Sequence, residues 1–281
     1  MAGVLYVTGT PIGNLSDLSP RAAETLRQVD FIAAEDTRVT LKLLNHFDIK
    51  KQLISYHEHN KRECGAWIVQ RLLTGESCAI VTDAGMPCIS DPGEDLVRLC
   101  AENGLTVAVV PGPSAAISAL AVSGLSTQRF CFEGFLSTNR KNRMAHLEQI
   151  KNLPNTLIFY EAPHKLTATL QDMLAVFGDR RIALCRELTK LHEEVIRTTL
   201  EQCLALYEDK SPRGEYVLII EGSVQEEATD GMTREEAVSM VLNLVRQGAS
   251  LSDAAKATAK ASSFKKGELY KAALEQAEGS K

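Results

Sequence analysis

Three loops of small residues are the sequence feature that most directly suggests a binding site. Each follows a short apolar run that is typical of a β-strand, and the loops read Thr8-Gly9-Thr10-Pro11-Ile12-Gly13-Asn14, Thr82-Asp83-Ala84-Gly85-Met86-Pro87 and Pro111-Gly112-Pro113-Ser114-Ala115-Ala116. In open α/β sheets, ligands bind outside the carboxyl ends of the strands. Gly, Ala and Ser leave backbone N–H and C=O groups within reach of a ligand. The loops therefore predict a ligand site at one sheet edge, although any one of them alone is compatible with a tight turn.

The common nucleotide-binding motifs are absent from the sequence. Gly9-x-x-x-Gly13 lacks the order of the dinucleotide motif G-x-G-x-x-G, and no phosphate loop of the form G-x-x-x-x-G-K-[ST] occurs. We therefore do not expect a dinucleotide-dependent or phosphate-loop enzyme.

Ionisable residues follow two further predicted strands. A high density of such groups beside a cleft is typical of a substrate site, where pKa values can be tuned. These residues are Glu35, Asp36, Arg38, His57, His59 and Asn60.

Structural alternatives stay open for the acidic and basic residues around Asp36 and for the two histidines. Asp36 or Thr37 suits the N-cap of a helix, with a local ion pair to Arg38. His57 and His59 could be a surface pair, or could bind a metal ion. Their i, i+2 spacing differs from the i, i+4 spacing of a helical zinc motif, so we favour a substrate contact and expect no metal.

Composition describes an ordinary soluble protein. The 281 residues are 44% hydrophobic and 24% charged, which is enough chain for two domains. No apolar run approaches the roughly 20 residues of a membrane helix, and no signal peptide precedes residues 4–7, so we expect a cytoplasmic protein. Seven scattered cysteines without a C-x-x-C pair predict neither zinc nor disulfides. Because the net charge is −5, local basic patches would have to bind any nucleic-acid partner.

Strand-like and helix-like patterns alternate over most of the chain, which predicts an α/β fold with largely parallel pairing. The predicted strands are 4–8, 31–34, 53–56, 79–82, 106–110, 130–133, 156–160, 182–186 and 216–220, and the clearest helices are 20–29, 62–73 and 96–102. We expect an N-terminal α/β domain over 1–113 and a second one over 114–223, followed by a polar linker.

The C-terminal segment 232–281 has a different character. Thr233-x-x-Glu236 predicts a capping box, and residues 251–277 predict two helices separated by a break at 262–264. This pattern is typical of a small helix-turn-helix appendage. Its lysines 265, 266 and 271 favour contact with an RNA backbone, as does the basic patch Arg140-Lys141-x-Arg143. A role in dimerisation or packing is the alternative.

Several of these blocks resemble the tetrapyrrole methylase superfamily. They are the loop around Pro11, Asp83-Ala84-Gly85 and Pro111-Gly112-Pro113-Ser114-Ala115. Within the superfamily, the whole chain is most similar to bacterial members that methylate ribosomal RNA. The blocks that carry this closer match are Thr10-Pro11-Ile12-Gly13-Asn14-Leu15, Ala33-Ala34-Glu35-Asp36-Thr37-Arg38, Asp83-Ala84-Gly85-x-Pro87-x-Ile89-x-Asp91-Pro92-Gly93 and Arg186-Glu187-Leu188-Thr189-Lys190. The superfamily's common first loop, Gly-x-Gly-Pro-Gly-Asp, is altered here, which argues against a porphyrin-type enzyme.

The resemblance implies a tetrapyrrole methylase-like fold of two α/β domains, with S-adenosylmethionine bound in the cleft between them, and a homodimer. The residues it implies at the cofactor are Pro11, Asp83, Ala84, Gly85, Ile89, Ser114, Ala115, Tyr160, Glu161 and Leu188. It further implies 2′-O-methylation of a cytidine in the decoding region of 16S ribosomal RNA, within the small ribosomal subunit.

A ribose 2′-hydroxyl is a weak nucleophile, so a base, or a cation that lowers its pKa, would accelerate that reaction by roughly 10²–10⁴-fold. The candidate catalytic residues are Glu35, Asp36, Arg38, His57, Asn60 and Lys190. Glu35, Asp36 and His57 are candidate bases or orienting groups, and Arg38 and Lys190 are candidate cations. We expect Asp36 and Arg38 to matter most.

Two other functions stay open. The first is a methyltransferase of the same fold that acts on a small molecule such as a tetrapyrrole, which the basic appendage disfavours. The second is a non-catalytic RNA-binding factor of ribosome assembly. Three small-residue loops disfavour it, because a protein that only binds RNA has no need of them.

Overall fold

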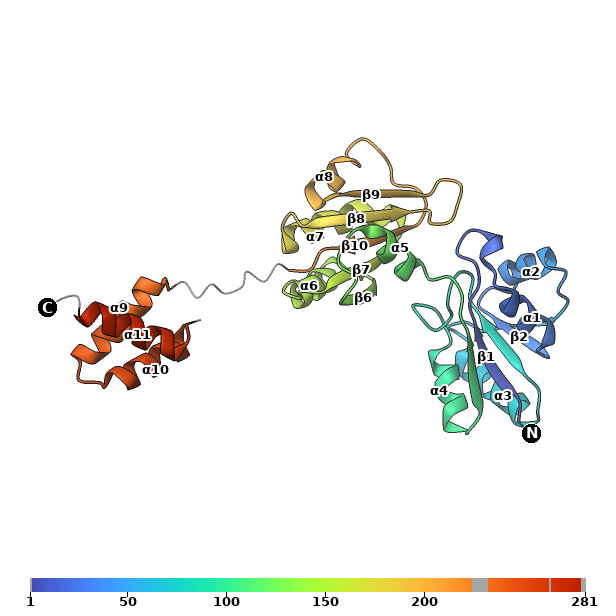
Figure 1. Cartoon of the computed structure of the whole chain (residues 1–281). Helices are drawn as coiled ribbons and strands as arrows, with labels where there is room; N and C mark the ends of the chain where they lie inside the picture. The colour runs from blue at the N-terminus through green and yellow to red at the C-terminus, as the bar shows by residue number, and fades with distance from the viewer. Residues whose placement is uncertain (1, 224–231, 263, 279–281) are drawn as a thin grey trace. The chain divides into compact units, whose positions relative to one another are not determined.

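The computed structural model describes residues 2–223, 232–262 and 264–278 of the chain. It contains two compact units, the first ending at Ser223 and the second formed by the C-terminal helices (Figure 1). Within the described ranges, no helix has the length and apolar character needed to cross a membrane. The division of the first unit into domains 1–113 and 114–223 stays a prediction.

Five parallel strands form the first sheet, in the order β3-β2-β4-β1-β5. They are β1 (Val4–Thr8), β2 (Phe31–Ala34), β3 (Gln52–Ser55), β4 (Cys78–Val81) and β5 (Thr106–Val110). Helices α1 (Pro20–Gln28) and α2 (Thr37–His46) cover one face, and α3 (Lys61–Leu73) and α4 (Glu94–Glu102) cover the other. Every residue of β2 and β4 is buried, as expected of central strands in a sheet that is covered on both faces.

The three small-residue loops lie together at the carboxyl edge of this sheet, because β4, β1 and β5 are neighbours. The backbones of Thr10 and Gly85 exchange two hydrogen bonds, of 2.8 and 3.1 Å. Gly85 has a φ of +85°, which glycine adopts at little cost. A Cβ on Gly9 would lie 2.7 Å from the Cα of Gly112, so the first and third loops approach too closely for any side chain. The prediction that these loops share one edge is confirmed.

The second sheet has the order β6-β7-β10-β8-β9. Its strands are β6 (Phe130–Phe135), β7 (Thr156–Glu161), β8 (Arg181–Arg186), β9 (Glu194–Thr199) and β10 (Tyr216–Ile220). Helices α6 (Arg140–Ile150), α7 (Leu166–Phe177) and α8 (Leu200–Ala205) pack on one face, and α5 (Ala115–Ser123) packs on the other. The short 3₁₀ helices η1 (Leu15–Asp17) and η2 (Pro163–Lys165) complete the unit.

The prediction of largely parallel pairing was wrong for the second sheet. Only β6 and β7 pair in parallel, whereas β10 runs antiparallel to both of its neighbours and β8 runs antiparallel to β9. Strand β9 was not predicted at all. The connection between β8 and β9 spans only residues 187–193, and a parallel crossover needs a dozen residues or more, so the chain must return as a hairpin.

Three helices form the second unit, namely α9 (Arg234–Arg246), α10 (Leu251–Ala261) and α11 (Lys266–Glu278). The predicted capping box is confirmed, because Thr233 Oγ1 accepts from Glu236 N while a Glu236 carboxylate oxygen accepts from Thr233 N. The helix break predicted at 262–264 lies between α10 and α11, although Ser263 itself lies outside the described residues, as does most of the predicted linker. Val241, Ala255 and Leu269 are among the buried residues that join the helices.

Candidate functional site

A cavity of about 940 Å³ lies where the loops of the first sheet meet the second sheet. Its size is at the upper end of the range usual for small-molecule sites. All of the predicted cofactor residues except Pro11 line it, and the next residue, Ile12, lines it in place of Pro11. Those lining residues are Asp83, Ala84, Gly85, Ile89, Ser114, Ala115, Tyr160, Glu161 and Leu188. The structure thus brings together loops that are far apart in the sequence, and their role at a cofactor stays a prediction.

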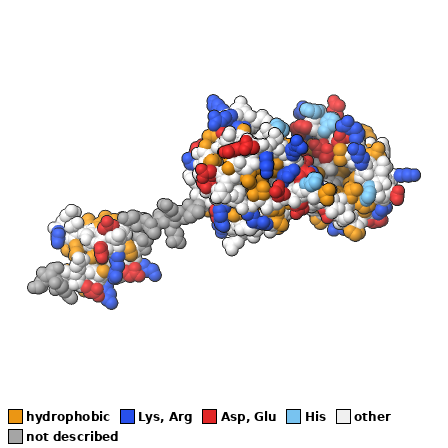
Figure 2. All heavy atoms as spheres, turned by 90° about the horizontal axis from the view of Figure 1, so that it is seen from above, with side chains coloured by type: hydrophobic (Ala, Val, Ile, Leu, Met, Phe, Trp, Pro, Cys, Tyr) orange, Lys and Arg blue, Asp and Glu red, His pale blue; other side chains and the backbone are white. Residues whose placement is uncertain are grey.

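The charges that line this cavity are of one sign. No lysine, arginine or histidine is among the described residues that line it. Figure 2 shows acidic side chains gathered where the two halves of the first unit meet, with basic side chains nearby. The lining carboxylates are Glu35, Asp83, Asp91, Glu161 and Glu215. Such a surface favours a cationic ligand and repels an anionic one.

Three of the carboxylates lie close together on the first-sheet side of the cavity. Thr82 Oγ1 donates to a carboxylate oxygen of Glu35 at 2.7 Å, and Asp36 N donates to Asp83 Oδ1 at 3.2 Å. Burial raises the pKa of Asp91 to about 6, and the negative charge of Glu35 adds to the effect. Burial likewise raises the pKa of Asp83, again with a contribution from Glu35. Side chains with perturbed pKa values in a cavity are typical of functional sites.

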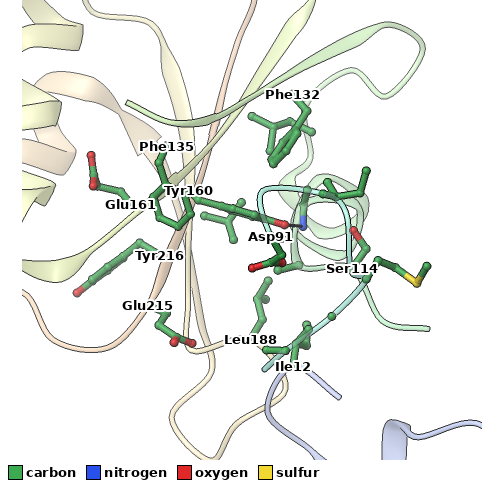
Figure 3. A pocket seen from close by; sticks show the side chains of 18 of the residues that line it. Ile12, Asp91, Ser114, Phe132, Phe135, Tyr160, Glu161, Leu188, Glu215 and Tyr216 are labelled. Carbon is green, nitrogen blue, oxygen red and sulfur yellow. Dashed lines mark hydrogen bonds between the residues drawn. The ribbon is translucent and has the colours of Figure 1, made fainter. Parts of the chain in front are cut away.

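Asp91 was not among the predicted site residues, although it belongs to the block Asp91-Pro92-Gly93. Its side chain enters the cavity from the connection between β4 and α4 (Figure 3). Cys88 and Ser90, which precede it, have φ values of +71° and +64°, so the backbone of this connection is strained. Strain of this kind collects at functional sites. The block itself was the only sequence signal that could have indicated Asp91.

Glu161 is already engaged by the protein. Its carboxylate accepts from Thr169 Oγ1 at 2.6 Å and from Ala162 N at 2.9 Å, and Lys165 Nζ lies 3.7 Å away. A carboxylate with these partners fixes the end of β7 and the following turn. Glu161 therefore shapes the wall of the cavity more than it offers a free acceptor.

The opposite wall is aromatic and helical. Tyr160 lies near Phe132, with ring centroids 5.0 Å apart, and near Phe135, at 5.4 Å (Figure 3). The Tyr160 hydroxyl accepts from Ala116 N at 3.2 Å, in the first turn of α5. Ser114 is the N-cap of that helix, but its side chain makes no capping hydrogen bond. The helix N-terminus thus adds partly positive N–H groups to a wall that is otherwise apolar.

Asp36 and Arg38 form the helix N-cap and the local ion pair that were the structural alternative to a catalytic role. Asp36 is the N-cap of α2, where its Oδ1 accepts from Arg38 N at 2.8 Å, and it forms an ion pair of 2.6 Å with the Arg38 guanidinium. The hydrogen bonds from Arg38 hold the pKa of Asp36 at about 2. Neither residue lines the cavity, and the Arg38 side chain is 87% exposed.

His57 and Asn60 also lie outside the cavity lining. Asn60 organises its own loop, because its Oδ1 accepts from His57 N at 2.9 Å and its Nδ2 donates to Ser55 O at 2.8 Å. Nδ1 of His57 is buried and has no hydrogen-bond partner among the described residues. The rings of His57 and His59 are 5.9 Å apart, and the described part of the chain holds no group of three ligating side chains suited to a metal ion.

Lys190 lies at the rim of the cavity. Its Nζ pairs with Glu187 at 2.9 Å and with Glu215, a lining residue, at 2.7 Å. The connection that carries it is strained, because Thr189, a β-branched residue, has a φ of +65°. A Cβ on Gly13 would lie 2.5 Å from Lys190 Cγ, so the first small-residue loop packs directly on this connection.

The predicted basic patch at the start of α6 is only partly available to RNA. Arg143 is buried, and its guanidinium pairs with Asp172 of α7 at 2.7 Å. Arg140 pairs with the same carboxylate at 3.0 Å while its side chain stays largely exposed. The expectation that Arg143 contacts RNA is therefore wrong for this structure, because its charge is used inside the protein.

Comparison with known proteins agrees with this geometry. Residues 4–204 match the family of Tetrapyrrole (Corrin/Porphyrin) Methylases. A protein of Halalkalibacterium halodurans named ribosomal RNA small subunit methyltransferase I is 51% identical, over 79% of this chain and 76% of that protein. Proteins of the same name from Synechocystis sp. and Bacillus subtilis are each 43% identical, over 97% and 96% of this chain and 98% and 94% of those proteins.

Solved structures show the same fold at much lower identity. Diphthine synthase superposes with a TM-score of 0.60 at 13% identity, over 78% of this chain and 90% of that one. Uroporphyrin-III-C-methyltransferase from Thermus thermophilus superposes with a TM-score of 0.54 at 19% identity, over 77% of this chain and 94% of that one. These two likenesses concern the fold alone.

Proposed function

The chain belongs to the tetrapyrrole methylase family, in the group named ribosomal RNA small subunit methyltransferase I, and we propose that it methylates ribosomal RNA of the small subunit with S-adenosylmethionine as donor. The finer proposal is that the acceptor is the 2′-oxygen of a cytidine in the decoding region of 16S ribosomal RNA. The observation that carries the proposal is the cavity, whose charged lining residues are all carboxylates in the described part of the chain.

The lining residues fit this cofactor. S-adenosylmethionine supplies an activated methyl group on a positively charged sulfonium, and it also carries an ammonium group. The carboxylate of Asp83 complements such positive charge. Backbone groups of the loop around Gly85 and the first turn of α5 offer hydrogen bonds and a favourable site for a ligand carboxylate. Aromatic rings such as Tyr160 favour both a flat base and a nearby cation.

The carboxylates that line the cavity also favour some candidate substrates over others. A uroporphyrin-type tetrapyrrole carries many carboxylates of its own, and a cavity lined by carboxylates would repel it. An RNA phosphate would be repelled in the same way, whereas a ribose and its base are uncharged and can enter. The phosphates then stay outside, where Arg38 is exposed. A non-catalytic RNA-binding protein would have no use for a cavity of this size and charge.

We assign the role of general base to Asp91. It lines the cavity, and its pKa of about 6 lies close to the pH of a working cell, where a base is most effective. Asp91 accepts the proton of the attacking hydroxyl, and the burial that raises its pKa also makes its carboxylate a better acceptor. Glu35, held by Thr82, keeps negative charge beside it. Asp36 cannot serve equally well, because its pair with Arg38 makes it a very weak base.

The proposal is tested by methyl transfer from radiolabelled S-adenosylmethionine to three acceptors. These are small ribosomal subunits lacking the modification, naked 16S ribosomal RNA and a uroporphyrinogen-type tetrapyrrole. We expect transfer to the ribosomal acceptors alone, and mass spectrometry of nuclease fragments locates the methylated nucleotide. Binding of S-adenosylmethionine is measured separately by calorimetry. Transfer to the tetrapyrrole, or the absence of cofactor binding, would overturn the proposal.

Arg38→Ala is expected to weaken binding of the substrate RNA and to leave the chemical step unchanged. The Arg38 side chain stays 87% exposed although it pairs with Asp36, whose backbone N–H donates to the lining residue Asp83, so it can bind a phosphate outside the cavity. Removing one cation that binds a phosphate reduces the slope of log affinity against log salt by about one. We therefore expect KM for small subunits to rise several-fold, with a shallower salt dependence and an unaltered kcat. Arg98→Ala, on exposed α4 surface, is the matched control. An unchanged salt slope in Arg38→Ala would contradict the assignment.

The predicted homodimer and RNA contact by the second unit stay predictions. Lys266 is the first residue of α11 and Lys265 precedes it, and Lys266 Nζ donates to Ser252 Oγ at 3.0 Å.

A further inference from the structure

Strand β6 contains a bulge that turns three phenylalanines toward one side. The register with β7 shifts between Phe132, which pairs with Ile158, and Gly134, which pairs with Phe159. Glu133 is thus the extra residue, and Gly134 has a φ of +63°. Side chains alternate between faces along a regular strand, so without the extra residue Phe135 would point away from Phe132. With it, Phe130, Phe132 and Phe135 all line the cavity. Bulges re-aim side chains in this way beside active sites.

Phe135 is the most exposed of the three. It is 55% exposed although it lines the cavity, against 40% for Phe130, and Phe132 is partly buried against the second-sheet core. One edge of the Phe135 ring is supported by Tyr160, at a centroid distance of 5.4 Å (Figure 3). Lys165 Nζ lies 6.0 Å from the ring centre. A large and mostly exposed aromatic ring is thus held at the cavity, with Tyr160 packed near it and the ammonium group of Lys165 over it.

We propose that Phe135 is a stacking platform for one base of the substrate RNA. The proposal rests on the proposed function, and it specifies an RNA base as the group that stacks on the exposed ring. Proteins recognise unpaired RNA bases by stacking them on aromatic side chains, and enzymes that act on a nucleotide within RNA must first take it out of its stack. The uncharged base and ribose enter past Phe135, because the cavity repels phosphate. The adjoining phosphate stays at the mouth, near the ammonium group of Lys165.

The test compares variants of Phe135 that separate stacking from simple apolar contact. Phe135→Ala removes the ring, Phe135→Leu keeps apolar bulk without a ring, and Phe135→Trp keeps a ring. We expect kcat/KM for small subunits to fall roughly 10- to 100-fold in the Ala and Leu variants, which is typical of removing one base stack, and to be largely restored in the Trp variant. The effect should lie mainly in KM. Leu73→Ala, a similarly exposed apolar residue on α3, is the matched control.

Two further measurements decide what each outcome means. Thermal unfolding shows that the variants are folded, and calorimetry measures their affinity for S-adenosylmethionine, which we expect to be unchanged. Loss of cofactor affinity in Phe135→Ala would overturn the inference, because the ring would then belong to the cofactor site. Normal kcat/KM in Phe135→Ala, or full rescue by Leu, would also overturn it. In each case the proposed function stands, since it is decided separately by methyl transfer and S-adenosylmethionine binding of the wild-type enzyme.

Discussion

Asp91→Asn is expected to lower kcat by roughly 10²–10⁴-fold, the range usual for loss of a general base. The amide has nearly the shape of the carboxylate but cannot accept the proton of the attacking hydroxyl. Single-turnover methyl transfer to small subunits measures the chemical step directly. Asp17→Asn, an exposed carboxylate of η1 outside the cavity, is the control and should behave as wild type. A fully active Asp91→Asn enzyme would remove Asp91 from the mechanism.

The pH dependence of the same reaction gives an independent readout. Because the pKa of Asp91 is raised to about 6, the wild-type rate should increase as the pH rises through about 6 and level off above pH 7. The residual rate of Asp91→Asn should lack this rise. A residue that only held the loop in place would change the rate without removing its dependence on pH.

As the pH rises, the free energy of unfolding should change in the opposite direction from the activity. The folded-state pKa of Asp91 lies above the unfolded value of about 3.9, so the folded protein binds more protons between about pH 4 and 6. The free energy of unfolding therefore falls as the pH rises through that window. Asp91→Asn removes this loss, and we expect it to be more stable than wild type at pH 8, by on the order of 1 kcal/mol once solvent screening is allowed for. Urea unfolding at pH 8 and pH 4.5 measures the difference, which should be much smaller at the lower pH.

Local patterns in the sequence were sufficient to predict the first sheet and the cavity loops. Strands β1, β2 and β5 were predicted to the residue, because each is a short apolar run that ends at a turn. The small-residue loops follow β1, β4 and β5, which are adjacent in the sheet. A parallel sheet brings such loops together whatever their separation in the sequence, so the sheet edge that lines the cavity could be predicted without coordinates.

Features that depend on pairing across long distances were not predictable in the same way. The direction of β10 and the existence of β9 depend on which strands meet, and neither is determined by the local pattern. Asp91 lies in a loop like many others until the fold places it in the cavity beside Glu35 and raises its pKa. In contrast, Asp36 and Arg38 were predicted to matter most for catalysis because they belong to a dense group of ionisable residues. In the structure they lie at the N-terminus of α2, where Asp36 is the N-cap.

Asp172→Ala is expected to destabilise the first unit by about 3–5 kcal/mol, the usual cost of leaving a buried charge without its partner. Asp172 is 3% exposed and Arg143 is 7% exposed, and their side chains pair between α7 and α6. Such a loss is a large part of the roughly 5–15 kcal/mol that stabilises a typical domain. Arg140→Ala removes only the exposed partner of the same carboxylate and should cost less than about 1 kcal/mol. Urea unfolding of both variants at neutral pH makes the comparison.

Replacing both partners tests whether the unpaired charge causes this destabilisation. Asp172→Leu combined with Arg143→Met leaves no buried charge unpaired, since Arg140 is exposed, and an apolar pair of similar volume often restores the stability of a buried ion pair. We expect the double variant to recover most of the stability. It should also bind substrate RNA as wild type does, because the charge of Arg143 is satisfied by Asp172 and by the carbonyl oxygen of Ser137. If the Arg143→Met change instead weakened RNA binding without altering unfolding, Arg143 would belong to the RNA-binding surface after all.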